Sequence, residues 1–217
     1  MQCLFDIEKL IRRDSMSLTK EEYQMAVFLC NCVYKGLAYP DNMKIKKSIR
    51  KLSGMKAEVF EYEDVDYIVF SGTDSTSLRD WFTNIQMAFG IKPRQFSDAL
   101  EFCLDVYNPQ KKTIVCGHSL GGAITEYCVS SISNTKFIAI TFNGAGIKHI
   151  CTPKHPENVY HYITKRDILN RIMVRMPLSY FKHVGEVITV EDDKWNGVKS
   201  HSNFHAFMNY KQDEVKL

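Results

Sequence analysis

The sequence predicts an α/β fold in which helices flank a mostly parallel central sheet. Short apolar segments typical of buried strands alternate with segments of helical periodicity. One of these strands runs directly into a glycine-rich turn at residues 117–122, and a helical segment follows the turn. The 217 residues are 45% hydrophobic, with no repeat or linker that divides them. We therefore expect a single domain over residues 1–217.

The individual elements follow from periodicity and from turn residues. Thr19 and Glu22 have the spacing of a capping box, which opens the first helix. Apolar spacing of three and four predicts helices at residues 19–38, 78–89, 96–107 and 123–131. Apolar runs bounded by turn residues predict strands at residues 57–62, 67–70, 113–116, 137–142, 159–163 and 184–190. Residues 143–146 are expected as a flexible loop and residues 44–54 as a basic connector.

Charge and composition exclude several classes of function. The 28 basic and 25 acidic residues leave a net charge of +3, without the density of a nucleic-acid footprint. The basic connector is read as a solvated face rather than as a patch attracted to anionic headgroups. The longest apolar run, residues 25–30, is far short of the ~20 residues of a membrane span. We expect no nucleic-acid partner and no membrane span.

The cysteines and the N-terminus point to a cytoplasmic location. The seven cysteines are scattered through apolar segments and lack C-x-x-C spacing, which predicts buried free thiols in a reducing compartment. Acidic residues interrupt the N-terminus where a signal peptide needs an apolar stretch. Secretion by an unusual route stays open as an alternative.

The glycine-rich turn carries the pattern G-x-S-x-G around Ser119. In a nucleophile elbow a serine sits in a strained turn between a strand and a helix, and the glycines allow close packing. The alternative is a tight turn in which Ser119 only caps the helix. The apolar strand before Gly117, and the small residues Gly122 and Ala123 after the motif, favour the elbow.

Three segments together resemble the class 3 (fungal-type) lipases of the α/β-hydrolase superfamily. They are residues 69–73 (Val-Phe-Ser-Gly-Thr), residues 80–84 (Asp-Trp-Phe-Thr-Asn) and residues 117–123 (Gly-His-Ser-Leu-Gly-Gly-Ala). They occur in the order of that family, and the likeness extends from about residue 57 to residue 210. The resemblance implies an α/β-hydrolase fold and a serine hydrolase.

The resemblance also implies two donors for an oxyanion hole. Thr73 takes the position of the family's strand-end donor, through its backbone N–H and its hydroxyl. The second donor is the N–H of Leu120, directly after the nucleophile. Where the family has an arginine in this strand-end motif, this sequence has Ser71, which affects the packing of the loop more than the chemistry.

The acid and the base are expected after Ser119 in the chain, in that order. Asp167 follows a predicted strand and resembles the family's strand-loop-Asp segment, whereas Asp192 and Asp193 look like an exposed turn. The alternative for Asp167 is a cap on a short following helix.

Two C-terminal histidines remain as candidate bases. His205 resembles the family's C-terminal histidine, because an aromatic residue, Tyr210, follows five positions later. We therefore predict the triad Ser119, Asp167 and His205. His201 lies four residues earlier and is the alternative, since the two could share one helical face.

These residues predict a carboxylic ester hydrolase that acts on acylglycerols or phospholipids through an acyl-enzyme. No metal or cofactor is expected, and the partners would be a lipid or small ester and, transiently, a membrane or lipid-droplet surface. Two alternatives are an acyltransferase with the same triad and a catalytically silent lipid-binding domain.

Residues 78–89 carry an apolar stripe directly after Thr73. Its members are Leu78, Trp81, Phe82, Ile85 and Phe89, which lie on one helical face. The segment resembles a lipase lid, and a fixed surface helix is the alternative.

Overall fold

The structure is a computed structural model. It describes residues 17–40, 43–72, 94–133, 136–148, 150–151, 154–175, 182–193 and 196–211. In these residues the strands form one seven-stranded sheet in the order β1-β2-β3-β4-β5-β6-β7. Their bounds are β1 Lys44–Arg50, β2 Lys56–Tyr62, β3 Val65–Phe70, β4 Lys112–His118, β5 Phe137–Phe142, β6 Val159–Thr164 and β7 Glu186–Val190. The strands β3 to β7 are parallel, and the β1–β2 and β2–β3 pairs are antiparallel.

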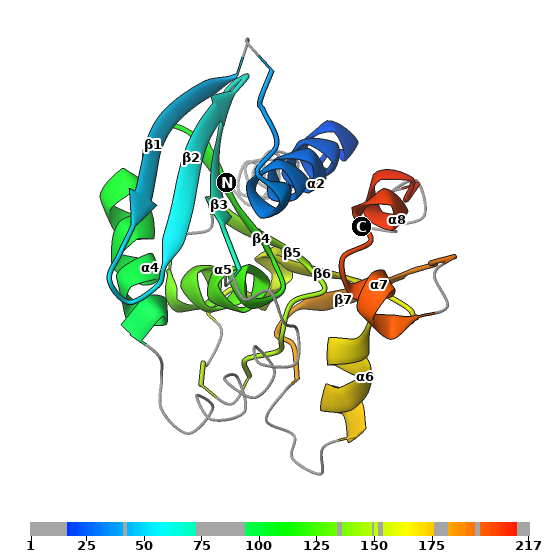
Figure 1. The fold of residues 1–217 in the computed structure, drawn as a ribbon. Coiled ribbons are helices and arrows are strands. Elements are labelled where there is room, and N and C mark those ends of the chain that lie inside the picture. The colour runs from blue at the N-terminus through cyan, green and yellow to red at the C-terminus, as the bar shows by residue number, and fades with distance from the viewer. Residues whose placement is uncertain are drawn as a thin grey trace, which may run out of the picture.

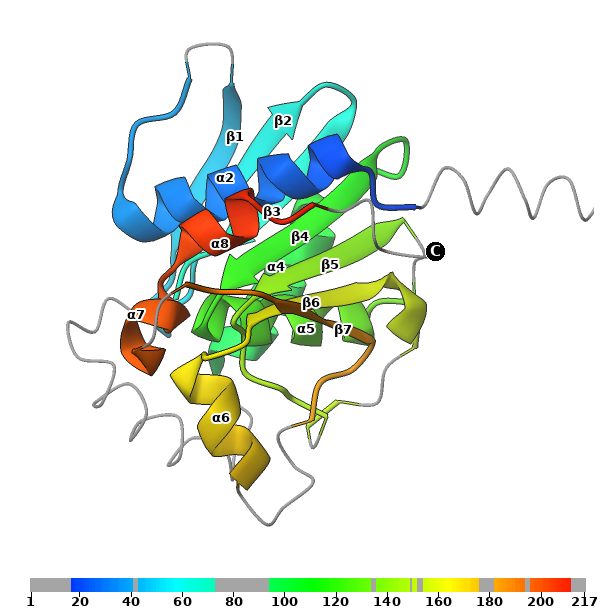
Figure 2. The same ribbon diagram turned by 90° about the vertical axis from the view of Figure 1, so that its right-hand side faces the viewer.

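Helices cover both faces of the sheet, as Figures 1 and 2 show. The helical elements are α2 Lys20–Lys35, α4 Arg94–Val106, α5 Leu120–Ser131, a 3₁₀ turn at Pro156–Asn158, α6 Ile168–Arg175, α7 Gly197–His201 and α8 Phe204–Met208. The α4 and α5 helices pack on one face, and α2 and α8 lie side by side on the other. This mostly parallel sheet with flanking helices confirms the predicted fold class.

Two apolar clusters fill the two interfaces between sheet and helices. Successive strand residues point to opposite faces, so Val115 joins the cluster under α4 and α5, whereas Ile114 and Cys116 join the cluster under α2. Every residue of β5 is buried, as expected for an internal parallel strand. The continuous apolar runs in the sequence therefore gave the internal strands correctly.

The N-terminal helix begins as the capping box predicts. The Thr19 hydroxyl accepts from the Glu22 N–H, and the Glu22 carboxylate accepts from the Thr19 N–H. The helix ends at Lys35 because Gly36 adopts a left-handed conformation with φ 63°. The prediction placed this end a few residues later.

The expectation of a basic connector at residues 44–54 is wrong in its first part, because Lys44–Arg50 form the edge strand β1. Nearly all of its side chains are exposed, so the apolar alternation of a half-buried strand is absent. Backbone pairing with β2 and the ion pairs of Lys46 with Asp66 and Glu61 hold the strand instead. A charged edge strand also resists pairing with other chains.

The parallel strands bring their carboxyl ends to one edge of the sheet. Phe70 of β3 pairs with Gly117 of β4, and His118 of β4 pairs with Phe142 of β5. Ligand sites in such sheets form at this edge. In the described part of the chain, no helix has the length and apolar character that crossing a bilayer requires.

Candidate active site

Ser119 occupies a sharp turn between β4 and α5. Its φ of 60° and ψ of −121° lie in a region that residues other than glycine rarely adopt. The Ser119 N–H donates to the carbonyl of Phe142 on the neighbouring strand, which fixes the turn at the carboxyl edge of the sheet. This is the strained geometry that an elbow requires.

The two motif glycines allow close backbone contacts around this turn. A Cβ on Gly117 would lie 2.4 Å from the backbone of Gly121, and a Cβ on Gly121 would lie 2.2 Å from the carbonyl oxygen of Phe70. No side chain fits at these distances. Glycine at position 117 therefore lets β4 approach the start of α5, and glycine at position 121 lets α5 approach the end of β3.

Asp167 follows β6 and is completely buried. Its Oδ1 accepts from the backbone N–H of Asn170 at 2.7 Å and from the Asn170 side-chain amide at 2.8 Å, so it caps the start of α6. Its Oδ2 lies 2.5 Å from His201 Nδ1. Asp167 therefore caps α6 and is also the hydrogen-bond partner of a histidine.

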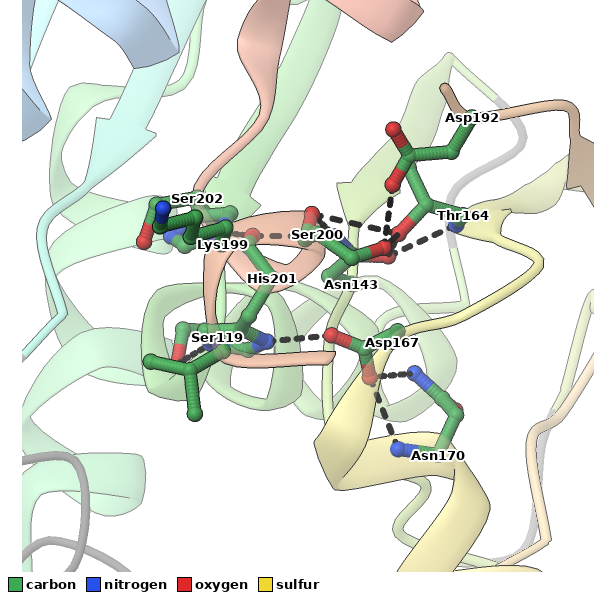
Figure 3. A network of polar contacts seen from close by, with 12 residues as sticks. Ser119, Asn143, Thr164, Asp167, Asn170, Asp192, Lys199, Ser200, His201 and Ser202 are labelled. Atoms are coloured by element: carbon green, nitrogen blue, oxygen red, sulfur yellow. Dashed lines mark hydrogen bonds and ion pairs between the residues drawn. The ribbon is translucent and has the colours of Figure 1, made fainter. Parts of the chain in front are cut away.

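His201 lies between Ser119 and Asp167, as Figure 3 shows. Its Nε2 is 2.9 Å from Ser119 Oγ, and its ring is fully buried. Because a carboxylate only accepts, the Nδ1 carries the hydrogen and the neutral Nε2 can accept the serine proton. The three side chains have the connectivity of a nucleophile, a base and an orienting acid.

His205, the predicted base, is not part of this arrangement. The α7 helix ends at His201, and α8 begins only at Phe204, so the two histidines do not share one helical face. In α8, Phe204 and Phe207 face the core, and His205 is exposed next to Asn209. The placement of His205 at the site is wrong, and His201 takes that position.

A buried polar network holds the short helix that carries His201. The Asn143 side-chain amide donates to the carbonyls of Ser200 and His201 at 3.3 and 2.9 Å, and its oxygen accepts from the Thr164 N–H at 2.8 Å (Figure 3). The Ser200 hydroxyl contacts Thr164 and Asp192. His201 is therefore held through its backbone as well as through Asp167.

The sequence pattern predicts a flexible loop at residues 143–146 and does not indicate the role of Asn143. These residues are buried, and Asn143 has a φ of 47°. Asparagine is one of the few residues that tolerate this conformation. An asparagine directly after a buried strand, at the edge where the site forms, was the available signal.

His118 supports His201 from the elbow itself. Its Nε2 donates to the His201 carbonyl at 2.7 Å. Burial, reinforced by the neighbouring His201, lowers the pKa of His118 to about 3. His118 is therefore a neutral hydrogen-bond donor across the physiological pH range.

Of the two expected oxyanion donors, the structure describes Leu120 but not Thr73. Leu120 is the first residue of α5, where backbone N–H groups have no partner within the helix. Thr73 lies outside the described residues. Gly72 immediately before it lies close to Ser119, because a Cβ at Gly72 would be 4.0 Å from the Ser119 Cβ. The described part of the chain thus passes beside Ser119 at Gly72.

One cluster in the described residues has the composition of a metal site. Donor atoms of Glu126, His161 and His183 all lie within 4.8 Å of one another. However, His161 Nε2 lies 2.6 Å from the carbonyl of Val184, which only accepts, so this nitrogen must carry a hydrogen. Only Glu126 and His183 keep free ligand atoms, which is too few for a protein zinc site.

The strand order, the elbow and the histidine at the sheet edge define this protein as an α/β-hydrolase. A sequence model of a phospholipase-like family, the Tle-like phospholipase domain, matches residues 35–210. The chain belongs to this family. No curated protein sequence gives a significant match.

Solved lipase structures share the fold. The native Rhizomucor miehei lipase propeptide complex has 19% sequence identity and a TM-score of 0.53, over 88% of this chain and 78% of that one. The Lip2 lipase of Yarrowia lipolytica has 15% identity and a TM-score of 0.55, over 80% of each chain. The expected resemblance to class 3 lipases is thereby confirmed as a shared fold.

Proposed function

We propose that the protein hydrolyses carboxylic ester bonds of phospholipids or acylglycerols with Ser119, His201 and Asp167 as its catalytic triad. The proposal depends above all on one observation, the pair of hydrogen bonds at 2.9 and 2.5 Å that joins the three side chains. The phospholipase-like family favours phospholipids as the substrate class.

The reaction begins when Ser119 Oγ attacks the ester carbonyl carbon and His201 Nε2 takes the hydroxyl proton. The carbonyl oxygen becomes an oxyanion, which the N–H of Leu120 and, by the family resemblance, Thr73 stabilise. Asp167 faces the imidazolium that forms. When the tetrahedral intermediate collapses, the ester C–O bond breaks and His201 returns the proton to the leaving alcohol.

Water completes the cycle. The water oxygen attacks the acyl carbon while His201 takes a proton from the water. The bond between the acyl carbon and Ser119 Oγ then breaks, and His201 returns the proton to Ser119 Oγ. The products are a free fatty acid and an alcohol or lysolipid, and Ser119 is regenerated. An alcohol in place of water would give acyl transfer, which no observation favours.

A lipid panel tests the proposal. Purified wild type and Ser119→Ala are incubated with vesicles of phosphatidylcholine or phosphatidylglycerol and with emulsified triglyceride, and released fatty acid is quantified. Wild type should release fatty acid, and the variant should release none. A fluorophosphonate probe should add its mass to Ser119 in the wild type alone. A wild type that is neither labelled nor active on any ester would show that this is a silent domain.

A further inference from the structure

A chain of hydrogen bonds continues from Asp167 on the side away from His201. The Asn170 amide nitrogen donates to Asp167 Oδ1 at 2.8 Å, whereas His201 contacts Oδ2 (Figure 3). The Asn170 amide oxygen lies 3.1 Å from His183 Nε2. His183 Nδ1 in turn lies 3.2 Å from Glu126 Oε2. Two side chains therefore connect the acid of the triad to a second, buried carboxylate.

The direction of each bond in this chain follows from the atoms involved. An amide oxygen only accepts, so His183 Nε2 must carry a hydrogen. This donor holds the Asn170 oxygen toward His183 and the Asn170 NH₂ group toward Asp167. A flipped amide would turn its oxygen toward the carboxylate and its NH₂ toward another donor, so both contacts would become repulsive. The His183 donor and the Asp167 acceptor thus favour the same orientation of the Asn170 amide.

Glu126 fixes the position of His183. Its Oε1 accepts from the backbone N–H of Val184 at 2.8 Å, and its Oε2 faces the His183 ring, so one carboxyl group holds both the side chain and the following backbone. Burial raises the pKa of Glu126, and the contact with His183 opposes this effect. His161, 3.8 Å from the same oxygen, donates to the Val184 carbonyl. Both residues restrain the segment that carries His183.

A buried carboxyl–imidazole pair is costly as a packing element. Its desolvation penalty can exceed its electrostatic gain, and apolar residues of similar size often stabilise a protein equally well. The hydrogen bonds of Glu126, His183 and Asn170 run in sequence from one side chain to the next and end at Asp167. Orientation of that acid accounts for a polar cluster at this place.

We propose that His183, anchored by Glu126, is a positioning residue of the triad that orients Asn170 and thereby keeps Asp167 Oδ2 directed at His201. This inference rests on the proposed function and extends it beyond the three triad residues. It predicts a selective effect on the chemical step. The orientation of His201 matters for proton transfer, whereas the hydrogen bonds of Asn170 and His183 in the described part of the chain lead to Asp167 and Glu126 and not to Ser119.

Four variants test the inference against a soluble p-nitrophenyl ester. In His183→Leu the donor to Asn170 is lost, and in Asn170→Asp a carboxylate replaces the amide that faces Asp167. Both should lower kcat by roughly 10- to 100-fold with KM unchanged, a loss typical of an outer hydrogen-bond partner. His183→Gln keeps a donor at the Nε2 position and should retain kcat within a few-fold. His155→Gln, at the other end of β6, is the matched control and should equal the wild type.

Two further measurements make each outcome decisive. The fluorophosphonate labelling rate of Ser119 should fall in parallel with kcat, and thermal unfolding should show a cooperative transition in each variant. If His183→Leu does not fold, Asn170→Asp carries the test. An active wild type with unchanged kcat in the folded variants would overturn this inference alone, as would equal losses in His183→Gln and His183→Leu. A wild type that is neither labelled nor active would overturn the proposed function, and this inference with it.

Discussion

His118 donates a hydrogen bond to the backbone carbonyl of His201 at 2.7 Å, and the two ring centroids lie 4.8 Å apart. The residue directly before Ser119 therefore holds His201, which contacts Ser119 from 82 positions later in the chain. Through this bond the end of β4 and the end of α7 form one unit. The geometry between Ser119 and His201 consequently depends on backbone contacts as much as on the triad itself.

The first prediction separates the two C-terminal histidines. His201→Ala should lower kcat for a p-nitrophenyl ester about as far as Ser119→Ala does, by roughly 10⁶-fold, because members of a triad act as a unit. His205→Ala, which removes an exposed ring on α8, should stay within a few-fold of the wild type. Steady-state kinetics of the three variants provide the measurement, and a larger loss in His205→Ala than in His201→Ala would contradict the assignment.

The second prediction concerns the network that holds α7. Asn143→Asp keeps the shape of the side chain and tolerates its φ of 47° but loses the amide that donates to Ser200 and His201. In the variant a carboxylate oxygen faces these two buried carbonyls in place of a donor, which should lower the free energy of unfolding by about 1–3 kcal/mol, and kcat should fall as well. Urea unfolding checks the first effect. Asn108→Asp, at an exposed turn, serves as the control and should change neither quantity.

The internal strands could be predicted because their signal is local. A parallel strand buried on both faces, such as β5, needs apolar side chains at consecutive positions. The edge strand β1 has no such requirement, since its backbone pairs with β2 while its side chains stay in solvent. The lysines and the arginine of β1 indicate that the segment is exposed to solvent, but they do not indicate that it is a strand.

The site was predictable where each residue is attached to a strand end. Ser119 directly follows β4, and Asp167 lies in the short turn after β6, so their positions in the chain indicate their positions at the sheet edge. His201 lies on a five-residue helix, and tertiary contacts to Asn143 and His118 determine its place. One local signal did exist, because Phe204 and Phe207 at i and i+3 leave His205 on the opposite, exposed face.

The third prediction compares two glycines. Gly121→Ala places a Cβ 2.2 Å from the Phe70 carbonyl oxygen, a backbone atom that cannot move aside without shifting β3. The free energy of unfolding should fall by roughly 3 kcal/mol or more. Gly36→Ala meets no atom within 4 Å and bears only the cost of its φ of 63°, about 1–2 kcal/mol. Denaturant unfolding measures both, and equal losses would refute the packing argument.

The fourth prediction comes from the sequence, because residues 78–89 lie outside the described part of the chain. If this segment acts as a lid, its apolar stripe should favour a lipid surface, where Trp81 suits the interface. The rate of hydrolysis of a short-chain triglyceride should then rise abruptly above the solubility limit of the substrate. Trp81→Ala should weaken this rise. A smooth hyperbola through the limit in both proteins would indicate a fixed helix.

The last prediction concerns the dependence of stability on pH. The pKa of His118 is about 3 in the folded protein, because the ring is buried beside His201, and near 6.5 in an unfolded chain. Between these values the unfolded state binds a proton that the folded state does not, so the free energy of unfolding falls as the pH decreases. The contribution of neutral His118 to the free energy of unfolding is complete above about pH 6.5 and is lost as the pH falls toward 3. His161, whose pKa is also lowered by burial, acts in the same direction.

The non-titrating variant His118→Gln isolates this effect, because its amide can still donate to the His201 carbonyl. From pH 7 to pH 5 the wild type should lose about 2 kcal/mol more unfolding free energy than the variant. Urea unfolding of both proteins at the two pH values gives this difference directly. The remaining loss in the variant contains the contribution of His161, which the same comparison with His161→Gln would remove. Identical losses in wild type and His118→Gln would mean that His118 is protonated in the folded protein or already neutral in the unfolded one, and would contradict its role as a neutral donor.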